Sequence, residues 1–525
     1  MLPGLVGHEP WKPDEAYTFG VVHELLQGGS WVIPQIAGEP FIDKPPLFYL
    51  SAALSAQLFS PLLPPHDGAR LIVALWIVLS LLFTALAAHE LHGERNGLIA
   101  ALLLLGSLGL IVRSHQLIAD TAAFAGFAIA SFGIALMPRR PWWGGIWLGS
   151  GIGIIFLSLG MFEAAMPVVL AALLVLLHRH WRTGSSVSAL GMAILFAIPW
   201  LLIWPVLLYQ ANPVLFGAWL AHELPQLPAA DSGVLSSLLH YLSILPWYTF
   251  PAWPVALWAL WRAYRRNNLG APGMVMPLAG LLVCLAMLAL AGQARELYAL
   301  PLLIPVALLA TPGVGTLRRG AGNLWLWFSI MTFTFFIIVG WFYWSALELG
   351  LPAKLHNHLH TIRPGYDFGF RALPFLLGLG YTGAWFLLLA RLQRIVERPL
   401  VVWAAGLTAM WALLTTLFIG RIDTAKSYRS TVENMARALP ANYRCMAADE
   451  VGEAQRALVH YYAGIRLRRL ATDPRAESCD LLLSQGAPLL ERPLPPEWKQ
   501  IWEGHRPGDK DERLRLYRLD RPRTP

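Results

Sequence analysis

Charged side chains that could do chemistry gather near the start of a chain that is otherwise mostly apolar. Asp14 and Glu15 stand side by side, and Asp43 and Lys44 directly precede Pro45-Pro46. A carboxylate can take a proton from an acceptor group, and an ammonium group at a membrane surface can pair with a lipid phosphate. The prolines rigidify the backbone beside Lys44. An acidic helix cap and a lysine that reaches the membrane interface are the alternative interpretations, and both stay open.

Four further residues are candidates for binding or catalysis. Asp120 opens an apolar segment, where a carboxylate at membrane depth usually marks function, although it can also cap a helix. His222 lies in a long loop and is either a polar surface residue or, with Asp43 or Glu15, part of a divalent metal site. Arg295 and Tyr298 open another apolar segment, where the arginine could bind a phosphate or anchor the interface.

The composition identifies an integral membrane protein. Apolar residues make up 56% of the sequence, charged residues only 14%, and there are 23 tryptophans. The net charge of +8 comes from basic residues spread over short loops, a pattern of membrane topology and not of nucleic-acid binding. The sequence contains no Walker glycine loop, no zincin motif and no nucleophile elbow, which argues against ATP-driven transport, zinc proteolysis and serine hydrolysis.

Hydropathy predicts an all-α polytopic protein with about twelve spans. Short re-entries are expected near 159–163, which contains Glu163, and near 292–296. The spans are predicted at 67–89, 95–112, 117–137, 143–159, 163–178, 187–209, 240–262, 273–292, 296–312, 322–346, 372–391 and 399–420.

The loop charges predict the orientation of these spans. One set of alternate loops carries thirteen basic residues and the other carries five, so the first set is assigned to the cytoplasm. The loops 210–239 and 347–371 and the tail after residue 420 then lie outside, as do residues 1–66. Because no span precedes residue 66, we expect a missing N-terminal helix and about thirteen spans in the intact protein. Residues 45–60 are apolar but short, which predicts an interfacial helix.

The chain thus divides into a first outer loop at 1–66, a transmembrane domain at 67–420 and a tail at 421–525. The tail is polar and predicts a small α/β domain outside the membrane. Its cysteines, Cys445 and Cys479, are equally compatible with a disulfide and with two thiols. Helices are expected at Ser427–Leu439 and Glu453–Tyr462, and strands at Tyr443–Ala447, Leu481–Ser484 and Leu514–Leu519.

Taken together, these motifs resemble the membrane glycosyltransferases of the GT-C class. The nearest branch is the bacterial 4-amino-4-deoxy-L-arabinose (lipid A) transferases, with the protein O-mannosyltransferases as relatives. The resemblance covers most of residues 10–440 and implies a GT-C fold. It also implies inverting transfer of a sugar from a polyprenyl (undecaprenyl) phosphate at the periplasmic face of a bacterial inner membrane. The motifs are Trp11–Glu15, Gly29–Pro34, Asp43–Pro46, Asp120, His222 and Gln293–Pro305.

The resemblance also implies roles for individual residues. Asp14 would be the catalytic carboxylate, with Glu15 beside it and Asp120 as the second acidic residue of the cavity. The donor phosphate would meet Lys44, together with Arg295 and Tyr298. Asp43 and His222 would match a metal-binding pair, so zinc, magnesium or manganese is a candidate cofactor, and no nucleotide is expected. Membrane lipids would surround the spans, and lipid A, another glycan or a protein would be the acceptor.

Three positions depart from the family pattern. Ala16-Tyr17 replaces the Arg-Tyr that usually follows the acidic pair, and Leu159-Gly160 replaces a Lys-Gly at the re-entry. Asp43 stands where the family has glutamate. Loss of the re-entry lysine puts the donor sugar, or activity itself, in question. The alternatives are an enzyme similar to the protein O-mannosyltransferases, a lipid or solute transporter, and an inactive homologue that acts in assembly.

Overall fold

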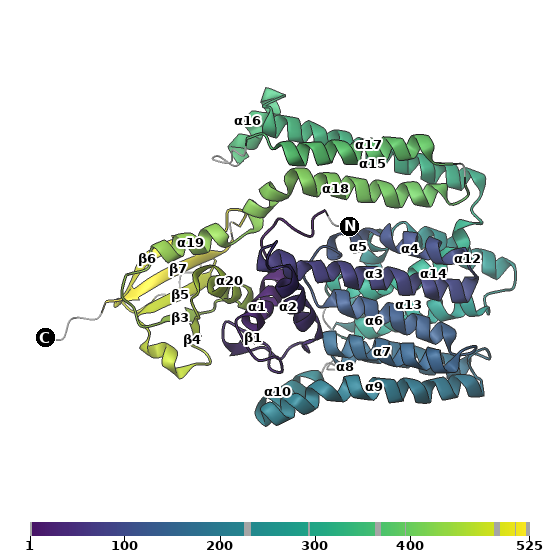
Figure 1. The fold of residues 1–525 in the computed structure, drawn as a ribbon, viewed down its shortest axis with the longest axis horizontal. Helices are drawn as coiled ribbons and strands as arrows, with labels where there is room; N and C mark the ends of the chain where they lie inside the picture. Colours follow the sequence, from purple (N-terminus) through teal and green to yellow (C-terminus); the bar gives the residue numbers. More distant parts are fainter. Residues whose placement is uncertain are drawn as a thin grey trace. The chain divides into compact units, whose positions relative to one another are not determined.

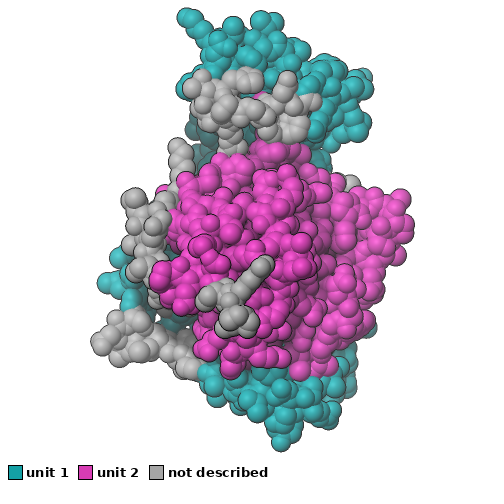
Figure 2. Space-filling model, turned by 90° about the vertical axis from the view of Figure 1, so that its left-hand side faces the viewer, with its two compact units in different colours: residues 1–5, 73–418 teal, residues 6–72, 419–525 magenta. Residues whose placement is uncertain are grey.

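A computed structural model describes residues 3–224, 233–291, 294–362, 369–393, 395–487, 494–509 and 511–520, with the side chains of 359–362 left aside. The chain forms two compact units, coloured separately in Figure 2. Unit 1 comprises residues 1–5 and 73–418, and unit 2 comprises residues 6–72 and 419–525. Unit 2 therefore combines an early segment of the sequence, which begins at Val6, with the C-terminal segment.

Long helices make up unit 1 and confirm the predicted multi-pass membrane protein (Figure 1). Within the described residues, eight helices are long and apolar enough to cross a membrane. They include α3 and α18, which extend into unit 2. These helices are α3 (Pro65–His92), α7 (Pro141–Leu159), α9 (Gly184–Ala211), α13 (Pro272–Leu290), η2–α14 (Glu296–Val314), α15 (Arg319–Glu348), α17 (Ala372–Arg391) and α18 (Arg398–Lys426).

The other four predicted spans are helices of a shorter or interrupted kind, so a total of twelve spans stays a prediction. Two of them are single helices, and two are broken in the middle. The interruption in α11–α12 falls at Pro251, whose nitrogen cannot donate to a helical hydrogen bond. The helices are α4 (Asn96–Leu105) with α5 (Leu108–Arg113), α6 (Asp120–Leu136), α8 (Met161–Leu177), and α11 (Val234–Tyr248) with α12 (Ala252–Arg265). Two more helices, α10 (Pro213–Glu223) and α16 (Ala353–Ile362), complete the unit.

Small residues bring α6, α7 and α9 into close contact. A Cβ atom added at Gly133 of α6 would lie 2.4 Å from the backbone nitrogen of Leu148 in α7. A Cβ atom added at Gly149 of α7 would lie 2.4 Å from the carbonyl oxygen of Ala193 in α9. Membrane helices associate through such close backbone packing because lipid gives them little hydrophobic driving force.

Unit 2 combines the N-terminal segment with a five-stranded sheet. The N-terminal part contains α1 (Asp14–Leu26), the hairpin β1–β2 (Gln35–Ile36 and Glu39–Pro40) and α2 (Leu47–Phe59). The predicted helix at 45–60 is therefore confirmed as a helix. The sheet order is β4-β3-β5-β7-β6, with β3 parallel to β4 and β5, and the other pairs antiparallel. The strands are β3 (Met446–Asp449), β4 (Arg468–Arg469), β5 (Leu481–Gly486), β6 (Trp498–Gly504) and β7 (Arg513–Leu519).

The predicted α/β tail is confirmed, and its helices α19 (Arg429–Arg437) and α20 (Glu453–Ala463) lie where the sequence placed them. The sequence missed β4 and β6, and it placed the first strand slightly too early. Cys445 and Cys479 form a disulfide. Ala16 of α1 belongs to the same buried core as Leu458 of α20 and Leu516 of β7, so α1 is an integral part of this domain.

Candidate active site

The predicted catalytic pair occupies the first turn of α1. Asp14 and Glu15 follow Pro13, and acidic side chains interact favourably with the positive end of a helix. Asp14 is half-buried, whereas Glu15 is only 2% exposed. The neighbouring carboxylates therefore have different surroundings, and Glu15 needs a partner that compensates its buried charge.

Arg70 of α3 is that partner. Its side chain is fully buried, and its Nε donates to Glu15 Oε1 at 3.1 Å. Its Nη1 donates to Asp67 Oδ1 at 2.8 Å and to the carbonyl oxygen of His8 at 3.3 Å. Burial, followed by the charge of Arg70, lowers the pKa of His8 to about 4, so this imidazole is neutral at pH 7. One arginine thus compensates two buried carboxylates and joins the start of α1 to the start of α3.

A second polar network holds the residues that precede α1. Glu9 Oε1 accepts from Arg429 Nη1 at 2.9 Å, and Glu9 Oε2 accepts from the Tyr462 hydroxyl at 2.8 Å. Asp423 Oδ1 accepts from the Glu9 backbone N–H and from the Trp11 indole, both at 2.9 Å. Burial and the Glu9 carboxylate raise the pKa of Tyr462, so its hydroxyl stays a donor. Side chains from α18, α19 and α20 therefore position the approach to the acidic pair.

Lys12 provides a third anchor just before Asp14. Its ammonium group pairs with Glu512, lies 3.5 Å from Asp509 Oδ2, and sits 5.5 Å from the ring centre of Tyr428. The Tyr428 hydroxyl also donates to Glu512 at 2.8 Å. Burial lowers the pKa of Lys12, but its hydrogen bonds with Glu512 and Tyr428 outweigh burial and raise the pKa above its usual value. Lys12 therefore stays charged and tethers α1 to the C-terminal domain.

Asp43 and Lys44 lie between β2 and α2, also in unit 2. Asp43 is exposed and Lys44 is half-buried, and the two prolines that follow them are buried. Burial, followed by the charge of Asp43, raises the pKa of Glu453 at the start of α20. Asp43 therefore faces a second carboxylate of the same unit. The phosphate-binding role of Lys44 and the metal-binding role of Asp43 stay predictions.

Asp120 lies in unit 1, where it opens α6 and is 4% exposed. It lines a narrow pocket with Leu159, Glu163 and Tyr298, which come from α7, α8 and η2. The described lining contains two carboxylates and a phenol but no cationic side chain. Leu159 is the position where the resemblance expects lysine, so this pocket lacks the positive charge that the family pattern would supply.

Arg295 and Tyr298 lie next to each other at the start of η2. The Arg295 guanidinium carbon is 5.6 Å from the ring centre of Tyr298, within the range of a cation–π contact. Glu296 Oε2 lies 3.8 Å from Nη2 of Arg113, at the end of α5. The structure thus brings one predicted phosphate-binding pair together. Gln293, at the start of the expected motif, lies outside the described residues.

His222 is exposed near the end of α10, whereas its neighbour Glu223 is 4% exposed. Glu223 Oε2 accepts from the Met161 backbone N–H at 2.8 Å, which caps the first turn of α8. Burial raises the pKa of Glu223, and this hydrogen bond and His222 partly offset the shift. The sequence pointed to His222, but Glu223 makes the buried contact with the re-entry.

The predicted metal-binding pair is Asp43 and His222. Within the described ranges, no three His, Cys, Asp or Glu side chains gather in a way that could hold a metal ion. Asp43 belongs to unit 2 and His222 to unit 1. The divalent metal therefore stays a prediction, and no chemical step is derived from it.

Comparisons with known proteins agree with this architecture, although no protein-family model matches the chain. The undecaprenyl phosphate-alpha-4-amino-4-deoxy-L-arabinose arabinosyl transferase of Pseudomonas aeruginosa UCBPP-PA14 is 28% identical over 437 residues, covering 79% of this chain and 73% of the relative. The protein of the same name from Pseudomonas savastanoi pv. phaseolicola is 26% identical, covering 79% and 75%.

A solved structure shows the same fold. ArnT from Cupriavidus metallidurans, crystallised with undecaprenyl phosphate, superposes with a TM-score of 0.67 at 18% identity, covering 98% of this chain and 95% of that one. The apo form of the same protein gives a TM-score of 0.64 and covers the same percentages of the two chains. The chain is therefore similar in sequence to the aminoarabinose transferases, and it shares the fold of ArnT.

Proposed function

We propose that this protein transfers aminoarabinose from undecaprenyl phosphate to lipid A at the periplasmic face of a bacterial inner membrane. The observation that carries the proposal is sequence similarity to aminoarabinosyl transferases across 79% of the chain. The fold shared with ArnT supports it. The greater number of basic residues in one set of loops supports the orientation.

The proposed reaction is an inverting displacement at the anomeric carbon of the sugar. The bond from that carbon to the donor phosphate oxygen breaks, and its electron pair leaves with undecaprenyl phosphate. A new bond forms from the carbon to an acceptor oxygen, and Asp14 takes the proton if the acceptor carries one. Among the acidic pair, Asp14 is the better candidate because Glu15 is engaged by the buried Arg70.

The chemistry of the acceptor determines how much Asp14 must contribute. A hydroxyl acceptor keeps its proton at neutral pH, so transfer to it requires a base. A phosphate monoester loses its second proton near pH 6 and is largely ionised already. With a lipid A phosphate that still carries one proton, Asp14 would accept a hydrogen bond from it and take that proton as the new bond forms, while Lys44 would stabilise charge on the departing phosphate.

Reconstitution with defined substrates tests the proposal. The purified chain in lipid nanodiscs would receive undecaprenyl phosphate-aminoarabinose and lipid A, and mass spectrometry would follow addition of one aminopentose. We expect transfer by the wild type and a loss of about 100-fold or more in Asp14→Asn. Glu497→Gln, at an exposed carboxylate of unit 2, is the matched control and should match wild type.

Two results would count against the proposal. Transfer only to exported-protein peptides, with no product on lipid A, would support an enzyme similar to the protein O-mannosyltransferases. Full activity in Asp14→Asn would remove Asp14 from the mechanism even if the overall reaction stands.

A further inference from the structure

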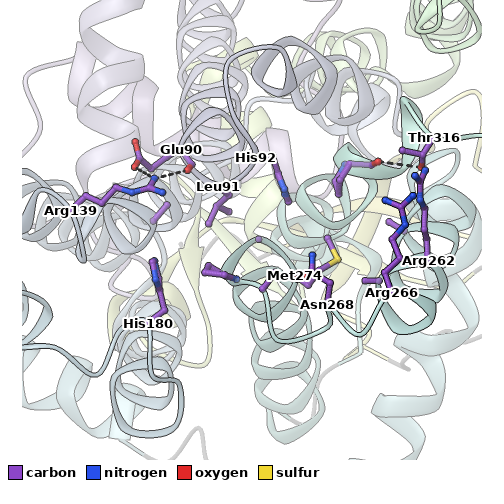
Figure 3. A pocket seen from close by; sticks show the side chains of 17 residues that line it. Glu90, Leu91, His92, Arg139, His180, Arg262, Arg266, Asn268, Met274 and Thr316 are labelled. Atoms are coloured by element: carbon purple, nitrogen blue, oxygen red, sulfur yellow. Dashed lines mark hydrogen bonds and ion pairs between the residues drawn. The ribbon is translucent and has the colours of Figure 1, made fainter.

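Unit 1 contains a cavity of about 450 Å³ at the helix ends opposite Asp120 (Figure 3). Asp120 opens α6, and Arg139, which lines the cavity, follows the end of that helix. The 17 residues of α6 span roughly 25 Å, so the two sites lie on opposite sides of a membrane-sized layer. The ends of α3, α12 and α14 and the start of α13 complete the walls.

Positive charge dominates this cavity. Arg139, Arg262 and Arg266 line it with a single carboxylate, Glu90. Glu90 Oε1 is 2.6 Å from Arg139 Nη1, so that pair is already neutral. No carboxylate of the described residues pairs with Arg262 or Arg266. Figure 3 shows Arg139 and Glu90 on one side of the cavity and Arg262 and Arg266 on the other.

The spacing of the two arginines favours an anion between the walls. Arg262 and Arg266 are four residues apart at the end of α12, so they share one face of the helix and repel each other. A phosphate group would relieve that repulsion, and a guanidinium group can bind it through two parallel hydrogen bonds. Burial, followed by the charge of Arg139, lowers the pKa of His180, which favours its neutral form. His180 therefore does not compensate the positive charge of the arginines.

Contacts of His92 with two neighbouring helices form part of the cavity wall. His92 Nε2 hydrogen-bonds the carbonyl oxygen of Leu308 at 3.1 Å, which joins α3 to α14. Gly273 lets α13 approach this ring, because a Cβ atom there would lie 2.5 Å from His92 Cε1. Leu91 and Met274 add apolar surface beside the charged groups.

Exposed tryptophans indicate that the cavity lies at headgroup depth. Trp142 and Trp143, shortly after Arg139, are 68% and 57% exposed, and Trp261, beside Arg262, is 47% exposed. Tryptophan side chains concentrate where lipid tails meet the headgroups. A ligand in the cavity can therefore reach it from the membrane as well as from water.

We propose that this cavity binds the phosphate headgroup of an anionic phospholipid. Arg262 and Arg266 hold the phosphate, and the apolar part of the lining accepts the glycerol portion. The loop charges place this site in the cytoplasmic leaflet, where basic pockets between membrane helices bind such headgroups. The site is separate from the proposed transfer reaction and does not depend on it.

Native mass spectrometry of the full-length protein tests the proposal. The chain would be released from nanodiscs of phosphatidylcholine doped with phosphatidylglycerol, and retained lipid would be counted. We expect R262A/R266A to retain at least about tenfold less phosphatidylglycerol than the wild type. Arg265→Ala is the matched control, because Arg265 lies on the same helix but does not line the cavity. Its guanidinium carbon lies 5.9 Å from the ring centre of Trp261.

Three results would overturn the proposal. Equal retention by wild type and R262A/R266A would show that the arginines hold no lipid. Complete displacement of the lipid by inorganic phosphate would assign the site to a soluble phosphate. The third result is that R262A/R266A loses the same thermal stability, relative to the wild type, in pure phosphatidylcholine nanodiscs as in the doped nanodiscs. That result would mean that the arginines only offset the negative ends of the helices. R262K/R266K, which keeps the charge but not the fork geometry, should retain an intermediate amount.

Discussion

Replacement of Arg70 by methionine should destabilise unit 2 more than any exposed charge substitution. Arg70 is fully buried and its guanidinium group binds Glu15, Asp67 and the His8 carbonyl. Methionine fills a similar volume but removes the guanidinium group that Glu15 and Asp67 contact, and these carboxylates are only 2% and 4% exposed. An uncompensated buried charge costs about 3–5 kcal/mol, which is a large part of the stability of a domain.

A double-mutant cycle measures how much of the lost free energy of unfolding comes from the Glu15–Arg70 pair. Glu15→Leu alone leaves Arg70 paired with Asp67 and should cost less than Arg70→Met, because one carboxylate remains. The double variant Glu15→Leu/Arg70→Met should be less destabilised than the sum of the single variants by about 1–3 kcal/mol. Arg70→Lys keeps the charge but cannot bridge both carboxylates in the same geometry, so it should fall between wild type and Arg70→Met.

Thermal unfolding in nanodiscs, followed by size-exclusion chromatography of the remaining folded protein, measures these changes. Arg444→Met is the control, because its side chain is 59% exposed where it pairs with Asp480, and it should stay near wild type. Transfer activity per folded molecule should also fall in Arg70→Met, since the pair fixes the first turn of α1. A loss of stability below about 1 kcal/mol in Arg70→Met would refute the reasoning.

Three further predictions concern other positions. Gly160→Ala should cost about 1–3 kcal/mol in thermal unfolding, because φ is +124° and the new Cβ would lie 2.5 Å from Glu223, whereas Gly191→Ala meets open space and should be neutral. Burial lowers the pKa of His8 in the folded state to about 4, below its usual 6.5, so stability is present above pH 6.5 and is lost as the pH falls toward 4, by up to roughly 3 kcal/mol. pH-dependent unfolding should show a smaller acid loss in a His8→Gln variant. Reduction of Cys445–Cys479, which closes a loop with a separation of 34 residues, should lower stability by about 3–4 kcal/mol, measured by unfolding with and without reductant.

The helices could be predicted because their signal is local. Each predicted span corresponds to at least one helix of the structure, since long apolar segments at membrane depth have few other ways to satisfy their backbone. The lengths of the individual helices were harder to predict. The interruption at Pro251 falls inside the single span predicted at 240–262.

The sheet was only partly predictable. β5 and β7 are rich in leucine and have buried residues, whereas β6 (Trp498–Gly504) is a polar edge strand with exposed positions. Apolar patterning carries little information for such a strand. Its pairing with β7 depends on the rest of the sheet, which a single segment cannot reveal.

The candidate site was predictable as a set of residue types but not as a set of contacts. The sequence contained the acidic pair, and the resemblance implied Asp14 as the catalytic carboxylate, but the contact of the buried Glu15 with Arg70 has no local sequence pattern. A signal existed, because Arg70 lies at the start of an apolar span where an unpaired charge is expensive. The anchoring of Lys12 by Glu512 joins residues 500 positions apart, and no local pattern encodes that distance.

Mass spectrometry of lipid A from the host bacterium tests the proposed transfer of aminoarabinose directly. Lipid A would be compared among the wild type, a strain lacking this gene, and deletion strains that express the wild-type chain or Asp14→Asn. We predict an aminopentose on lipid A that disappears on deletion and returns with the wild-type chain but not with Asp14→Asn. Lipid A that is unchanged by deletion would contradict the account.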